Sequence, residues 1–232
     1  MITGQVSVFQ SRSQVLLLYV ALGGVVLFLY TSDPEWQLKV DVLRDSVILT
    51  WMASLMNLVF FGNGLSKLFG IRPRQTIGLV GILFSPLLHR DFNHLLANTL
   101  PFIILGWFIL IQSDIQGGSS FYAITITILL IGGIGTWLFG REAIHLGASG
   151  LIFGYIGFLL IRGYVGPTLW TVGFALLVFL MYGNQLWSMV PSSSESTISW
   201  EGHLFGFAGG IVAGMRPDLL ATVGEALSRI TQ

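Results

Sequence analysis

The chain has no cysteine and very little charge. Without cysteine it can form neither a disulfide, nor a thiol nucleophile, nor a thiolate metal site. Charged residues make up only 9% of the sequence, whereas a soluble domain has about 25%. The 11 basic and 11 acidic residues cancel to a formal net charge of zero, so no overall positive field would attract nucleic acid. We therefore expect neither a soluble domain nor a nucleic-acid partner.

Apolar residues dominate instead. They form 53% of the sequence, and the mean hydropathy is +0.79. A membrane-spanning helix needs about 20 predominantly apolar residues. Several runs approach that length and predict an all-α polytopic membrane protein embedded in a lipid bilayer. The seven runs cover residues 15–30, 46–61, 92–111, 121–139, 148–162, 167–187 and 200–215.

The runs divide the chain into three expected parts. Residues 1–45 form an N-terminal segment, and its run at 15–30 is not followed by a small-residue cleavage site, which predicts a retained extra transmembrane helix. Residues 46–215 form the core. Residues 216–232 form a tail whose apolar positions recur at helical intervals, which predicts an amphipathic helix on the cytoplasmic membrane surface. Those positions are Leu219, Leu220, Val223, Leu227 and Ile230.

Two polar residues stand in glycine frames within these runs. Ser149 belongs to Gly-Ala-Ser-Gly at 147–150, and His203 belongs to Gly-His-Leu-Phe-Gly at 202–206. Polar groups at membrane depth are costly and are usually kept for function. Ser149 also follows a break in the apolar pattern, so it would meet the free N–H groups of a new helix. A serine and an imidazole together predict nucleophilic attack on a carbonyl, with Ser149 as nucleophile and His203 as general base.

Glycines beside both residues predict that their helices pack closely, which would bring His203 to Ser149. Plain helix packing remains an alternative for either segment taken alone, because small-residue faces are common and a lone serine often bonds its own helix backbone. The repeats are Gly150, Gly154 and Gly157 in one run and Gly202, Gly206, Gly210 and Gly214 in the other.

A third polar pair lies in the run at 92–111. His94 and Asn98 are four residues apart and share one face of an otherwise apolar helix. Such donors could stabilise an oxyanion together with the N–H of Ser149; simple hydrogen bonding to neighbouring helices is the alternative. Metal ligation is disfavoured, because no carboxylate lies nearby in a ligand pattern and the HExxH signature is missing.

These three motifs, in this order, resemble those of the rhomboid family of intramembrane serine proteases. Residues 85–98 (SPLLHRDFNHLLAN) are similar to its second core helix with the HxxxN motif, residues 147–150 to its GxSG motif, and residues 202–210 to its HxxGxxxG pattern. The similarity covers residues 50–215. It implies six core helices, a Ser149–His203 dyad that opens to the extracytoplasmic side, oxyanion stabilisation by His94 and Asn98, and no metal or cofactor.

The chain also departs from the family pattern. Where some rhomboids have a tyrosine that stacks on the catalytic histidine, this sequence has Phe153, which keeps the stacking face and loses the hydroxyl. A Trp-Arg pair of the first core loop is missing. His89 is interpreted as structural, and Glu201 is expected to point away from His203, so the predicted mechanism uses two residues, with the imidazole oriented by Phe153.

The sequence therefore predicts an intramembrane serine endopeptidase in the plasma (inner) membrane of a bacterium. Gly147, Gly150, Phe153 and Gly206 would form the frame around its dyad, and single-span membrane proteins would be its substrates. The first alternative is a catalytically silent rhomboid-like protein that binds membrane clients. A small proton-relaying transporter ranks last, because no span contains paired carboxylates and no inverted repeat is clear. The sequence does not indicate an oligomeric state.

Overall fold

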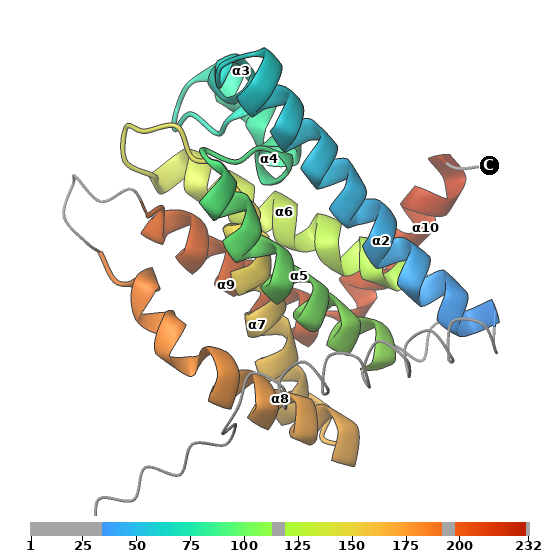
Figure 1. Ribbon diagram of the computed structural model, residues 1–232. Coiled ribbons are helices and arrows are strands. Elements are labelled where there is room, and N and C mark those ends of the chain that lie inside the picture. The colour runs from blue at the N-terminus through green and yellow to red at the C-terminus, as the bar shows by residue number, and fades with distance from the viewer. Residues whose placement is uncertain (1–33, 113–118, 192–197, 231–232) are drawn as a thin grey trace, which may run out of the picture. The chain divides into compact units, whose positions relative to one another are not determined.

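The structure is a computed structural model that describes residues 34–112, 119–191 and 198–230. Within these ranges the protein is all-α and contains no strand (Figure 1). The span expected at 15–30 lies outside the described residues. By its internal contacts the chain divides after Asp41, and Val42–Gln232 form the compact unit that holds the core. The main helices are α2 (Pro34–Leu55), α5 (Phe92–Gln112), α6 (Ser119–Phe139), α7 (Ser149–Val165), α8 (Leu169–Tyr182), α9 (Trp200–Met215) and α10 (Pro217–Ile230).

The first described helix, α2, includes residues that we did not expect to be helical. The apolar run was expected from residue 46, but residues 34–45 already belong to α2, which is continued by the π-helical turn Met56–Phe60. A Lys39–Glu35 ion pair at i,i+4, 2.5 Å long, adds local support. Hydropathy marks where a helix enters the bilayer, whereas the hydrogen-bonded helix continues into its polar flank.

A chain of short helices connects α2 to α5. It contains α3 (Gly64–Phe69), the 3₁₀ helix Thr76–Leu79, α4 (Gly81–Phe84) and the 3₁₀ helix Ser85–Leu87. One isolated antiparallel bridge, Ile71 to His145, ties this connection to the loop before α7. The connection therefore contacts the segment that leads to Ser149.

Four helices in the described ranges are long and apolar enough to cross a membrane: Pro34–Phe60, Phe92–Gln112, Phe121–Phe139 and Leu169–Met189. Helices α9 and α10 pass the same test only as a pair, bent by 95°. Helix α7 has 17 residues, and its residues from Leu151 to Leu159 are all buried. It contacts α5, α6, α8 and α9 (Figure 1). The protein is an integral membrane protein built around a short enclosed helix.

Glycines allow α7 and α9 to approach closely, as the sequence predicted. A Cβ atom on Gly206 would lie 2.0 Å from the carbonyl oxygen of Gly150, and one on Gly210 would lie 1.8 Å from that of Gly154. Any larger side chain would therefore force the two backbones apart. Because α7 begins at Ser149 and α9 contains His203, this contact brings the two candidate catalytic helices together.

Candidate active site

Ser149 is the first residue of α7, directly after a turn at Gly147 and Ala148. Gly147 has φ of +105°, a region that residues with a side chain rarely adopt. A Cβ atom there would also lie 2.6 Å from Cε1 of His94, so the imidazole packs directly against the glycine backbone. The Gly147 N–H donates to the carbonyl oxygen of Ser85 at 2.9 Å. Glycine at 147 thus permits both the turn and the close approach of His94.

His203 lies in the first turn of α9 and is 8% exposed. Its helix is capped by Ser199, whose Oγ accepts the N–H of Gly202 at 3.1 Å. The Phe153 ring stacks on the His203 ring with centroids 4.1 Å apart and planes 7° apart. The expected contact of Phe153 with His203 is therefore confirmed. Phe153 is one helical turn after Ser149, so this stacking holds the imidazole near the serine.

A single cavity of about 440 Å³ brings the candidate residues together: Ser149, His203, His94 and Asn98 all line it. Arg90, Arg141 and Glu142 also line it, so charged groups border the same space. No hydrogen bond joins Ser149 to His203 in the described part of the chain. Catalytic hydrogen bonds often tighten only when substrate binds, so a dyad without this bond is compatible with a resting state.

His94 and Asn98 lie on one face of α5, as their spacing predicted. The Asn98 side-chain amide donates to the carbonyl oxygen of His94 at 3.0 Å, which uses one of its two N–H groups. The His94 Nδ1 atom is buried and has no hydrogen-bond partner among the described residues. The Asp91 carboxylate caps the start of the helix by accepting the His94 backbone N–H at 2.8 Å. Asn98 therefore keeps one amide N–H without a partner among the described residues, whereas the unpaired Nδ1 of His94 is buried and not exposed to the cavity.

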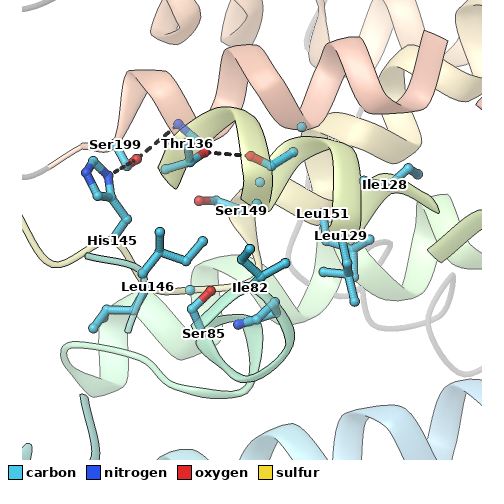
Figure 2. A pocket seen from close by; sticks show the side chains of 18 residues that line it. Ile82, Ser85, Ile128, Leu129, Thr136, His145, Leu146, Ser149, Leu151 and Ser199 are labelled. Carbon is cyan, nitrogen blue, oxygen red and sulfur yellow. Dashed lines mark hydrogen bonds between the residues drawn. The ribbon is translucent and has the colours of Figure 1, made fainter. Parts of the chain in front are cut away.

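A smaller pocket of about 50 Å³ adjoins Ser149. Ser85 from the connection before α5 and Thr136 from α6 face it together with Ser149 (Figure 2). Thr136 donates to the carbonyl oxygen of Gly132 at 2.8 Å, so its hydroxyl proton is already used. The pocket exceeds the volume that one water molecule needs, which is about 10–15 Å³ on the same measure.

A polar network that the sequence analysis missed ties the loop before Ser149 to the start of α9. Arg141 donates its backbone N–H to Glu201 Oε1 at 3.0 Å, and its Nε lies 3.8 Å from the same oxygen. Glu201 is fully buried and points to Arg141. The two residues are sixty positions apart, and no local pattern links them.

His145 belongs to the same network. Its Nε2 donates to the carbonyl oxygen of Arg141 at 3.1 Å, which leaves Nδ1 to accept from the Ser199 hydroxyl at 2.6 Å (Figure 2). Burial lowers the pKa of His145, because the charged form is poorly solvated there. His145 is therefore a neutral structural group, and its position shortly before the Gly-Ala-Ser-Gly motif was the only signal in the sequence.

His89 supports the turn before the nucleophile. The Ser54 hydroxyl donates to the carbonyl oxygen of Leu87 at 2.8 Å, so His89 Nδ1 donates to Ser54 at 2.9 Å. His89 Nε2 then accepts the N–H of Ala148 at 3.4 Å. Burial, and secondly the proximity of His94, lower the pKa of His89 to about 3. The histidine thus holds the residue next to Ser149.

Comparison with known proteins identifies the family to which the residues around the cavity belong. A family model described as the Rhomboid domain matches residues 76–216. Uncharacterized proteins of Mycobacterium bovis and Mycobacterium tuberculosis are each 39% identical over 194 residues, which cover 79% of this chain and 77% of the relative. An uncharacterized protein of Mycobacterium leprae is 38% identical over 151 residues, 62% of this chain and 58% of the relative. The matched region contains the cavity residues from α5, α7 and α9, and the chain belongs to the rhomboid family.

Proposed function

We propose that this protein is an intramembrane serine endopeptidase. The observation that carries the proposal is the 440 Å³ cavity, which Ser149, His203, His94 and Asn98 line together from three different helices. A nucleophile, a base and two polar groups suited to stabilise an oxyanion are the set that acyl transfer requires. In a protein with so few polar groups at membrane depth, their convergence on one space supports a catalytic role.

The chemistry follows from the atoms available. The Ser149 Oγ attacks the carbonyl carbon of a substrate peptide while His203 takes the hydroxyl proton. The carbonyl oxygen becomes an oxyanion, which His94, Asn98 and the Ser149 N–H stabilise. His203 then gives its proton to the leaving amine, and the C–N bond breaks. A water molecule, activated by the same imidazole, hydrolyses the acyl-enzyme and restores Ser149.

The charged residues that line the cavity indicate where a substrate would be cut. Arg90, Arg141 and Glu142 line it with the dyad, and charged side chains remain charged only where water reaches them. A peptide bond must leave its helix before the serine can attack it, and unpaired backbone groups are costly in lipid. We therefore propose that single-span membrane proteins are cut at a bond near a membrane boundary. We propose that this boundary is on the extracytoplasmic side of a bacterial plasma membrane.

Labelling with a fluorophosphonate, which modifies activated serines, tests the proposal. The wild-type protein should be labelled, whereas the Ser149→Ala variant should not. The labelling rate of His203→Ala should be lower than that of wild type by about a hundredfold or more, because general-base assistance is removed. Ser228→Ala serves as the matched control, because Ser228 is an exposed residue of α10. Absence of labelling in folded wild-type protein would instead favour a catalytically silent client-binding protein.

A further inference from the structure

Ser188 contacts the His203 imidazole from a different element. It lies near the end of the 3₁₀ helix Gly183–Met189, which continues α8, and it is half-buried. Its Oγ lies 2.9 Å from His203 Nδ1 and 2.8 Å from the carbonyl oxygen of Gln185. Both distances are within the normal range for hydrogen bonds.

The two bonds together determine where the protons lie. A serine hydroxyl carries one proton, and a carbonyl oxygen can only accept. Ser188 therefore donates to Gln185 and accepts from His203. The imidazole nitrogen that donates is Nδ1, so in the neutral ring Nε2 carries the free lone pair. This is the tautomer in which Nε2 can take a proton from a nucleophile.

Ser188 and Phe153 restrain the ring in complementary ways. Stacking on Phe153 fixes the plane of the imidazole, but it would still allow a half-turn flip of the ring about its Cβ–Cγ bond, which exchanges each nitrogen with a ring carbon. The hydrogen bond from Nδ1 to Ser188 opposes this exchange. Together the two contacts specify both the plane of the base and the nitrogen that is left for Ser149.

None of the described carboxylates near His203 has this position, and Glu142, which lines the same cavity, makes no hydrogen bond to the imidazole. Glu201 precedes His203 by two residues, but its Oε1 accepts from Arg141. Asp91 accepts the backbone N–H of His94. A neutral hydroxyl thus occupies the site at Nδ1, and it is a weaker acceptor than a carboxylate would be.

We propose that Ser188 is the positioning residue of the dyad, which holds His203 as the Nδ1–H tautomer. The inference rests on the proposed function. When Ser149 loses its proton to Nε2, the imidazolium has N–H groups at both nitrogens, and Ser188 continues to accept the one at Nδ1. No proton moves to Ser188, because its own hydroxyl remains bonded to Gln185.

Nitrogen NMR of protein labelled with ¹⁵N-histidine tests the tautomer without any need for activity. The His203 signals, assigned by comparison with a His203→Gln variant, should show a protonated Nδ1 and an unprotonated Nε2 in the wild-type protein. Ser188→Ala should shift the population toward the Nε2–H form, and Ser188→Thr, which keeps the hydroxyl, should not. The same tautomer in wild type and Ser188→Ala would overturn the proposal. If wild type showed the expected signals yet cleaved nothing, the proposed function would fail on its own.

Kinetics with a cleavable reporter give the second test. Ser188→Ala should lower kcat by about tenfold, the effect of losing one neutral hydrogen bond, while KM and the melting temperature stay close to wild type. Ser188→Thr should recover most of kcat. Gln185→Ala is the matched control, because it leaves the backbone carbonyl that accepts from Ser188. An unchanged kcat in Ser188→Ala, an effect on KM alone, or a Ser188→Thr variant as slow as Ser188→Ala would assign Ser188 to packing and overturn the proposal.

Discussion

Phe153 and His203 lie face to face, with ring centroids 4.1 Å apart and ring planes 7° apart. Phe153 is 4% exposed, so solvent does not compete for the imidazole face that it covers. The base of the proposed dyad is therefore oriented by an apolar ring on the nucleophile's own helix.

Replacing Phe153 by leucine should weaken catalysis more than folding. Leucine retains an apolar side chain but loses the stacking, which is worth about 0.5–1.5 kcal/mol for ring pairs. We expect kcat for a single-span reporter to fall by about three- to tenfold. Phe153→Tyr, which keeps the ring, is the control and should stay within about twofold of wild type. Equal kcat in Phe153→Leu and wild type would show that stacking does not position His203.

Gly206→Ala should destabilise the protein strongly, because its Cβ would lie 2.0 Å from the Gly150 carbonyl oxygen. Overpacking of this kind costs about 1–3 kcal/mol and sometimes more. Thermal melting in detergent measures the effect. Gly173→Ala is the matched control: a Cβ there meets nothing within 4 Å, so the variant should melt at or slightly above the wild-type temperature. Similar melting of both variants would refute close α7–α9 packing as a source of stability.

The sequence predicted the two candidate catalytic helices well because their signals are local. The apolar run at 200–215 coincides with α9, and the break before Ser149 coincides with the start of α7. Glycine spacing was sufficient to predict which faces of these helices meet. The helical state of residues 34–45 was missed, because the apolar run is interrupted by charged residues there whereas α2 continues through them.

The partners of the dyad histidine and of the preceding loop could not be predicted in the same way. Ser188 reaches His203 only because the 3₁₀ helix after α8 packs against α9. Glu201 and Arg141 meet through tertiary packing, sixty positions apart in sequence. No sequence pattern marks Ser188, Arg141 or His145 as functional. Their hydrogen-bond partners come close only through the packing of the helices.

Removing the proposed oxyanion donors should slow turnover without preventing binding. His94→Ala and Asn98→Ala should each lower kcat by about a hundredfold to a thousandfold, the usual effect of losing one such donor. KM should change little, because the oxyanion forms only along the reaction path. Steady-state cleavage of a reporter measures both constants. Unchanged kcat in both variants would show that the two residues serve only helix packing.

Acid should destabilise the folded protein through His89. Its pKa falls from 6.5 to about 3 on folding, chiefly because the ring is buried. Above pH 6.5 neither state binds a proton at this site. Between pH 6.5 and 3 the unfolded state binds one and the folded state does not, so stability is lost as the pH falls, by up to about 1.4 kcal/mol per pH unit.

The free energy of unfolding, measured in mixed micelles between pH 7 and pH 5, checks this prediction. His89→Gln should be less stable at pH 7, because it loses the contacts with Ser54 and Ala148, but its stability should depend less steeply on pH. A wild-type protein that becomes more stable as the pH falls would contradict neutral burial of His89.

Cleavage by purified protein in liposomes tests whether Ser149 is the nucleophile of a protease. The wild-type protein and the Ser149→Ala variant are reconstituted separately with a single-span reporter protein, and the fragments are identified by mass spectrometry. We expect the wild-type protein to cut the reporter at a defined bond near one membrane boundary, and the Ser149→Ala variant, melting at the wild-type temperature, to leave the reporter intact. Cleavage of equal rate and position by both proteins would contradict Ser149 as the nucleophile.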